Sequence, residues 1–249
     1  MAAKNKFMNA MKMPAIADMF SSEADRQRES GDLVTEVPLS ELHPFVNHPF
    51  EVRDDEDMQK LVDSIKENGV LTNLTVRPRA EGGYEIISGH QRFHAAQLAG
   101  LDKIKVQVRN VDDDQAIIDM VDANIQREHI SPMEKARALK MKNEAMKRSA
   151  GRRKENGCQL DTHFPEAKTA AQIGADVGES PKQIFRYIRL NELIPELQKQ
   201  VDSNTLKFNP AVELSYLTPD EQQSFLDYAE AQDCTPSLSQ AQKLKAASK

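Results

Sequence analysis

The sequence is poor in cysteine and has no long apolar run. Cys158 and Cys234 are its two cysteines, far apart and without metal-type spacing. We therefore expect a reducing cytoplasm and no disulfide framework. No segment approaches the roughly 20 apolar residues that span a bilayer, and the start of the chain has no signal-peptide pattern. The low cysteine content excludes a disulfide-rich secreted scaffold. The lack of a long apolar run predicts that the chain has no membrane-spanning segment.

Basic charge is also scarce overall, since the net charge is −6. That balance alone argues against a nucleic-acid binder. The distribution differs, because residues 135–154 hold nine Lys or Arg and one acid, a local balance of +8. A basic stripe inside an acidic chain is typical of contact with a phosphate backbone. A solvated helix face is the alternative that the same pattern allows.

The chain has room for two modest domains after a detached tail. We place the tail at residues 1–33, an α/β domain at 34–128 and a helical domain at 129–249. The tail is expected to be disordered. Its weak amphipathic pattern also suits docking of a short helix into a partner's groove. The residues of that pattern are Met8, Met11, Ala15, Met19 and Phe20.

Strands interleaved with helices predict the α/β domain. The expected strands are 34–38, 74–77, 84–87 and 103–109, and the expected helices start after Asp54 or Asp55, after Gly89 and at Asp112–Asp114. The turn at Gly89 passes from strand straight into helix. Such a turn gathers free backbone N–H groups at the positive end of a helix dipole, and Arg92 adds a planar charge on the first turn. This pattern favours a phosphate site, although an ordinary strand-to-helix turn also fits it.

Histidines also invite a metal interpretation, because His90 and His94 lie four apart on one predicted helix. No third ligand is placed to complete the set, so we reject it. The run Asp112–Asp114 fits a helix start, where acids complement the dipole, better than a metal clamp. No serine or cysteine carries a nucleophile pattern.

The second half is predicted to be helical. Ser131-Pro132-Met133-Glu134 is a capping box that starts a helix running to about Arg148. Residues 151–165 are expected to form a polar loop. Residues 170–190 then fit a helix-turn-helix, with a close approach at Gly174, a turn at Gly178 and a cap at Ser180. Early residues of its second helix would face the major groove, where Gln pairs with adenine and Arg with guanine. Further helices are expected at 195–201, 209–217, after Thr218 and at 237–244.

Two motifs support a family resemblance. Gly89-His90-Gln91-Arg92-Phe93-His94-Ala95 resembles the Gly-Glu-Arg-Arg-x-x-Ala box of the ParB family of DNA-partition proteins. Asn124-Ile125-Gln126-Arg127-Glu128, followed by Ser131-Pro132-Met133-Glu134-Lys135-Ala136, resembles the second family box. The order and distance of the boxes match, and the resemblance runs from about Thr35 to Leu244.

The resemblance implies a fold, ligands and partners. It implies an α/β ParB/sulfiredoxin-like domain, then an all-α helix-turn-helix domain. The chain would bind CTP and Mg²⁺ and load as a homodimer on double-stranded DNA at a short, palindromic site. It would then slide as a clamp in partition of a plasmid, chromosome or mobile element, cytoplasmic and associated with the nucleoid or plasmid. The N-terminal tail would engage a partition ATPase.

The resemblance also nominates site residues. The nucleotide set is Gly89, His90, Gln91, Arg92, Asn124, Arg127 and Glu128, with Asn124 and Glu128 toward the metal. Hard cations prefer oxygen ligands of this kind. The DNA set, which joins the basic stripe and the helix-turn-helix, is Arg148, Arg152, Arg153, Ser180, Lys182, Gln183, Arg186 and Arg189. Lys182, Gln183 and Arg186 are the expected base readers.

Three departures from the family boxes matter. Gln91 replaces an arginine, His90 replaces a glutamate, and Ala123 stands where a glutamate usually precedes Asn124. We therefore expect CTP binding with slow or negligible hydrolysis. The C-terminal dimerisation domain typical of the family is not evident. A regulator or nucleoid-occlusion-type factor without a partition role is the main alternative, and a ParB-like nuclease is a weaker one.

Overall fold

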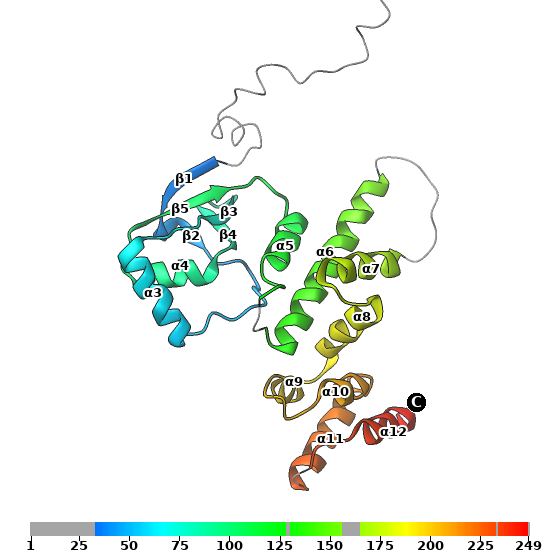
Figure 1. Ribbon diagram of the computed structural model, residues 1–249. Coiled ribbons are helices and arrows are strands. Elements are labelled where there is room, and N and C mark those ends of the chain that lie inside the picture. The colour runs from blue at the N-terminus through cyan, green and yellow to red at the C-terminus, as the bar shows by residue number, and fades with distance from the viewer. Residues whose placement is uncertain (1–32, 128–129, 156–164, 233, 249) are drawn as a thin grey trace, which may run out of the picture.

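Short strands in the first half of the chain pair into one mixed sheet (Figure 1). The computed structural model describes residues 33–127, 130–155, 165–232 and 234–248. The sheet order is β1-β5-β3-β4-β2. Its strands are β1 (Leu33–Pro38), β2 (Leu42–His43), β3 (Leu74–Pro78), β4 (Tyr84–Ser88) and β5 (Lys103–Val108), with the 3-10 turn η1 (Leu39–Glu41) after β1. The four predicted strands are confirmed, and β2 is an addition because its two residues are too short for a periodic signal.

Helices α3 (Glu56–Asn68) and α4 (His90–Leu98) pack against each other beside the sheet (Figure 1). Asp55 caps α3 by accepting a hydrogen bond from Met58 N–H at 3.0 Å, as the sequence predicts. The sheet contributes the buried side chains Leu74, Val76, Ile86 and Val106 to the core under α4. Burial of this apolar area holds α4 at the end of β4.

A second core joins the sheet unit to the helices that follow. Helix α5 (Asp113–Asp122) packs on α6 (Pro132–Glu155), and α6 packs on α7 (Pro165–Val177) and α8 (Pro181–Arg189). One hydrophobic cluster includes Phe50 and Ile87 before the predicted domain boundary and Leu139, Ile173 and Ile184 after it. The boundary at residues 128 and 129 stays a prediction, and its two sides share a core.

Two predicted boundaries in this region were wrong. Helix α6 continues to Glu155 rather than ending near Arg148, and α7 begins at Pro165 rather than at Ala170. Gly151 disfavours a helix by only about 1 kcal/mol relative to alanine. The arginines and lysine at 152–154 are good helix formers, so α6 passes through. Proline is favoured at a helix start, which accounts for α7.

The last helices form a third hydrophobic cluster with the start of α6. They are η2 (Leu190–Glu192), α9 (Pro195–Asp202), α10 (Phe208–Leu214), α11 (Pro219–Ala231) and α12 (Leu238–Ala247). Thr218 and Ser237 each complete a capping box, which confirms the predicted starts. The α/β unit followed by a helical region is the predicted fold class. Within the described ranges, no helix is long and apolar enough to cross a membrane.

Candidate functional site

Gly89 turns β4 into α4 in a left-handed conformation, with φ 107°. A side chain there would bring its Cβ within 2.9 Å of Leu74 and 3.2 Å of Arg92, so glycine is required both for the backbone angle and for space. Among the described residues, no side chain caps the start of α4. The first amides of α4 therefore face a ligand or solvent at the positive end of the helix dipole.

A cavity of about 300 Å³ lies beside this helix start. It is lined by Phe50, Glu51, Arg53, Asp55, Asp57, Met58, Leu61, Gln91, Arg127, Ile130 and Glu134. Two predicted nucleotide-site residues, Gln91 and Arg127, thus meet in one cavity although they come from separate sequence boxes. The cavity also receives Arg53 from the segment before α3, a residue that the motifs did not single out.

Arg127 is half-buried at this cavity. Burial lowers the pKa of its guanidinium, Glu134 raises it and the charge of Arg92 lowers it. Among the residues that the structure describes, Arg127 makes no ion pair within 4.0 Å, whereas Glu134 Oε1 lies 4.0 Å from Arg53 Nη2. The Glu134 carboxylate accepts hydrogen bonds from Glu51 N–H and Ser131 N–H, each at 2.9 Å. Arg127 is thus a cation placed to meet an anion.

Arg92 lies on the first turn of α4, as predicted, and its side chain braces a loop. Its Nη1 donates to the carbonyls of Thr72 and Asn73, at 2.6 and 2.9 Å, just before β3. Burial lowers the pKa of its guanidinium. Those two bonds fix the guanidinium, and its remaining N–H groups keep their donor capacity.

His90 faces the loop after β2. It is 6% exposed, and its Nε2 accepts a hydrogen bond from Phe45 N–H at 3.2 Å. Burial, the neighbouring His48 ring at 3.8 Å and Arg127 lower the pKa of His90 to about 3. His90 is therefore neutral at pH 7 and supports the loop; its predicted role toward the nucleotide stays a prediction.

The two histidines that suggested a metal diverge. His94 contacts Asp54 at 2.7 Å, away from the buried His90 ring. Among the described residues, no group of three or more His, Cys, Asp or Glu could hold a metal ion.

The second box begins where α5 ends. Asn124 is 1% exposed and donates its side-chain N–H to the Met120 carbonyl at 2.6 Å. Ala123 is exposed, and the Asp122 carboxylate accepts from Lys142 Nζ at 2.6 Å. The Asp122 side chain thus pairs with α6 and does not line the cavity. Glu128, the other predicted metal ligand, lies outside the described residues.

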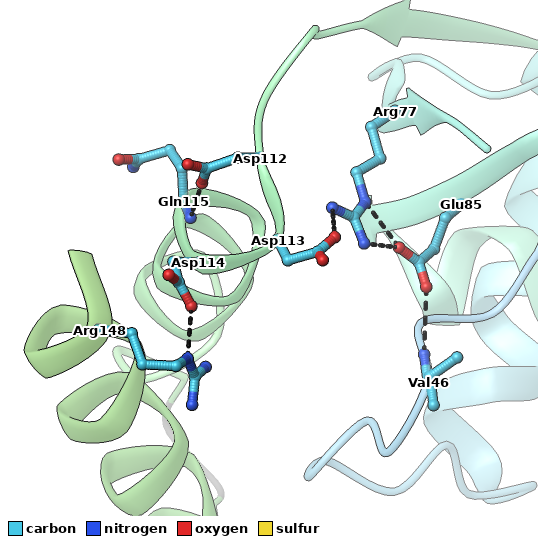
Figure 2. A network of polar contacts seen from close by, with 8 residues as sticks. All are labelled: Val46, Arg77, Glu85, Asp112, Asp113, Asp114, Gln115 and Arg148. Carbon is cyan, nitrogen blue, oxygen red and sulfur yellow. Dashed lines mark hydrogen bonds and ion pairs between the residues drawn. The ribbon is translucent and has the colours of Figure 1, made fainter. Parts of the chain in front are cut away.

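The three aspartates at the start of α5 make three separate contacts (Figure 2). Asp112 caps α5 by accepting from Gln115 N–H at 2.8 Å, which confirms the predicted helix start. Asp113 accepts from Arg77 at 2.6 Å, and the buried Asp114 accepts from Arg148 Nε at 2.8 Å. The contacts of Asp113 and Asp114 are not visible in the sequence pattern, because their partners are 36 and 34 residues away.

Arg77 also ties the sheet to this helix start (Figure 2). Its guanidinium pairs with Glu85 Oε2, at 2.7 Å from Nε and 2.5 Å from Nη2. Glu85 in turn accepts from Val46 N–H at 3.4 Å. The network joins β3, β4, the loop after β2 and α5.

The basic stripe is not one exposed face, because two of its lysines are paired within the fold. Lys142 is 1% exposed and donates to Asp122 and Asp176, at 2.6 and 2.8 Å. Lys135 pairs with Glu179 at 2.9 Å. Because α6 is packed against other helices, some of its basic side chains face the interior, where acidic side chains of the neighbouring helices neutralise them. Arg148 keeps half of its side chain exposed, and the side chains of Arg152 and Arg153 lie outside the described part.

Helices α7 and α8 pack as a pair across a short turn, in the region where the sequence predicts a helix-turn-helix. Ser180 caps α8 by accepting from Gln183 N–H at 3.2 Å, and Gly178 has a φ of 73°. A Cβ on Gly174 would lie 2.5 Å from the Glu179 carbonyl oxygen. The close approach, the turn and the cap that the sequence predicts are therefore confirmed.

The predicted base readers at the start of α8 differ in their surroundings. Lys182 is exposed, whereas Gln183 and Arg186 hydrogen-bond to each other at 3.0 Å. Arg189 points back into the fold: its Nη2 donates to the Ser215 carbonyl at 2.8 Å, and its guanidinium lies 4.4 Å from the Tyr216 ring centre. Lys182 is thus free on α8, Gln183 and Arg186 are partly exposed and paired with each other, and Arg189 braces the helix.

An α/β unit followed by a region of packed helices is the architecture of the ParB class. The ParB N-terminal domain family matches residues 23–125. The chain is 38% identical over 193 residues to the probable chromosome-partitioning protein ParB of Neisseria meningitidis, covering 78% of this chain and 60% of that protein. The chain belongs to the ParB family.

A solved structure agrees on the fold. The Pnob8-like ParB-N domain matches with a TM-score of 0.53 at 16% identity, covering 80% of this chain and 84% of that one. C-terminally truncated ParB of Caulobacter crescentus, complexed with CTP-gamma-S, is 26% identical and covers 74% of this chain and 92% of that one. Its TM-score is 0.36, which establishes no shared ligand. The chain spans 58–64% of the length of the first curated relatives that it matches.

Proposed function

We propose that this chain is a sequence-specific DNA-binding protein of the partition type that takes CTP with Mg²⁺ as a ligand. The observation that carries the proposal is the uncapped start of α4 beside Arg127 in a cavity of about 300 Å³. Helix amides and a half-buried arginine bind polyphosphate, and water competes poorly at such a site. The resemblance of the two sequence boxes to those of the ParB family implies that the nucleotide is CTP.

The phosphate side of the site is divided between two arginines. Arg127 offers its guanidinium directly to the cavity, and Arg92 stands on the first turn of α4 with two of its N–H groups already given to Thr72 and Asn73. Asn124 and Glu128 would hold Mg²⁺, as the second box implies. Cytidine selection is part of the proposal by resemblance.

DNA recognition is proposed for the helix-turn-helix. Lys182, Gln183 and Arg186 would meet base edges in the major groove. Arg148 and the arginines at 152 and 153 would meet phosphates. By resemblance, the protein acts as a homodimer on a palindromic site, its N-terminal tail engages a partition ATPase, and it resides on the nucleoid or a plasmid in the cytoplasm.

Calorimetric titration of the full chain with CTP, ATP, GTP and UTP in Mg²⁺ tests the nucleotide site. CTP should bind in preference to the others. Arg127→Ala and Arg92→Ala each remove a charge-assisted bond worth roughly 1.5–3 kcal/mol, or about ten- to over a hundredfold in affinity. Arg79→Ala is the matched control, because Arg79 pairs with Glu81 at 2.9 Å on the β3–β4 connection. Equal CTP affinity in the wild type and both site variants would refute the assignment.

A further inference from the structure

Arg186 in α8 is held by side chains from two helices. Its Nη1 donates to Gln183 Oε1 at 3.0 Å, one turn earlier in α8. Its Nη2 donates to Oδ1 of Asn209, an exposed residue in the first turn of α10. The guanidinium also lies 5.0 Å from the ring centre of Phe208, which packs on Tyr187 with ring centres 4.8 Å apart. The direction of Arg186 is therefore set by α10 as well as by α8.

The chemistry of arginine fixes how the two amides are turned. A guanidinium only donates hydrogen bonds, so the atoms that face it in Gln183 and Asn209 must be their carbonyl oxygens. The amide NH₂ groups of both residues are then the ends left for a ligand. Arg186 itself has used two of its five N–H groups and retains three. The three side chains together present donors to whatever meets this surface.

Guanine is the base that a donor surface fits. Its major-groove edge shows two acceptors, O6 and N7, whereas adenine shows one acceptor and one donor. A glutamine that reads adenine must accept from adenine N6 with its carbonyl oxygen. In this chain Arg186 holds that oxygen of Gln183. This contact within the fold therefore weakens the adenine preference expected for Gln183 from the helix-turn-helix pattern alone, and the donor surface favours guanine.

We infer that Asn209 is a positioning and specificity-determining residue of the DNA interface, and that Gln183, Arg186 and Asn209 act as one donor cluster selective for guanine. The inference rests on the proposed function. Asn209 lies outside the helix-turn-helix, 23 residues after Arg186, so the motif does not nominate it. The cluster makes α10 part of the reading surface.

Selection from a duplex DNA library with a randomised segment tests the inference. The full-length wild type, Asn209→Ala, Asn209→Asp and Gln223→Ala are compared, and the enriched sequences are then measured as purified duplexes against single-base variants. Gln223 is the control, an exposed amide on α11 that donates to Asp227 at 2.9 Å. Thermal unfolding by circular dichroism verifies that each variant is folded.

The wild type should enrich guanine at the position whose selectivity Asn209→Ala reduces. That reduction should be roughly three- to tenfold, less than the loss of a whole two-bond base contact. Affinity for random-sequence DNA should change less than about twofold, since no phosphate contact is removed. Asn209→Asp keeps an oxygen for Arg186, so it should retain the guanine preference while its charge weakens binding to all sequences.

A selective wild type with unchanged selectivity in Asn209→Ala would overturn the inference alone. Enrichment of adenine at the affected position would do the same. Equal losses for specific and random DNA would assign Asn209 a merely structural role. A wild type that enriches no sequence would overturn the proposed function, and the inference with it.

Discussion

Replacing Lys142 by methionine should destabilise the protein although the substitution is apolar and of similar length. Lys142 is 1% exposed, and its Nζ lies 2.6 Å from Asp122 and 2.8 Å from Asp176. One ammonium thus joins α5, α6 and α7. Lys142→Met leaves the two carboxylates near each other with no cation between them.

Two opposing effects set the magnitude. At an effective dielectric constant of about 20, each contact is worth roughly 6 kcal/mol of Coulomb energy. Desolvation of the charges offsets several kcal/mol of it per ion. Breaking a buried pair usually costs about 3–5 kcal/mol. Here the aspartate side chains are 44% and 45% exposed and can rehydrate, so we expect a loss of about 1–3 kcal/mol.

Urea unfolding of the full chain, followed by circular dichroism and intrinsic tyrosine fluorescence, measures this loss. With a slope of about 2 kcal/mol per molar urea, a 2 kcal/mol loss lowers the midpoint by about 1 M. Lys140→Met is the control on the same helix, since its 3.7 Å pair with Glu192 is exposed and should contribute less than about 1 kcal/mol. A Lys142→Met midpoint equal to that of the wild type would refute the reasoning.

Three further predictions concern pH, packing and turnover. The pKa of His90 is lowered to about 3 in the folded chain, whereas in the unfolded chain His90 binds its proton near pH 6.5. Its contribution to the free energy of unfolding is therefore intact above pH 6.5 and falls by about 1.4 kcal/mol per pH unit as the pH drops toward 3. His90→Gln should remove this pH dependence in urea titrations. Gly174→Ala forces a Cβ to 2.5 Å from a backbone oxygen and should lower the free energy of unfolding by about 1–3 kcal/mol. Gly151→Ala places its Cβ in open space and should raise the free energy of unfolding by up to about 1 kcal/mol. Thermal unfolding scans of both variants measure the two changes. Phosphate release with saturating CTP and DNA should be slow in the wild type and faster in Ala123→Glu. Asp122→Asn should be no slower than the wild type, because the Asp122 carboxylate is held in an ion pair. Brisk turnover in the wild type that is lost in Asp122→Asn would contradict this prediction.

The sequence alone determined most of the elements and several of their starts. Asp55, Asp112 and Ser180 each accept from a backbone N–H three residues later, so the signal and its partner lie within one turn of chain. Gly89 and Gly178 are equally local, because a positive φ is a property of one residue. Family boxes and helix-turn-helix were readable for the same reason: their spacing is fixed along the chain.

Only the tertiary structure decided which of the charged residues are free. Lys142 and Arg127 look alike in the sequence, as basic residues near the second box, yet packing places one between two aspartates and the other at a cavity. The partners of Lys142 lie 20 and 34 residues away, and no local period encodes such distances. The same holds for Asn209, whose contact with Arg186 depends on how α10 packs beside α8. Hydrogen bonds within a turn follow from local geometry, whereas long-range pairs form only after hydrophobic burial has fixed the helices.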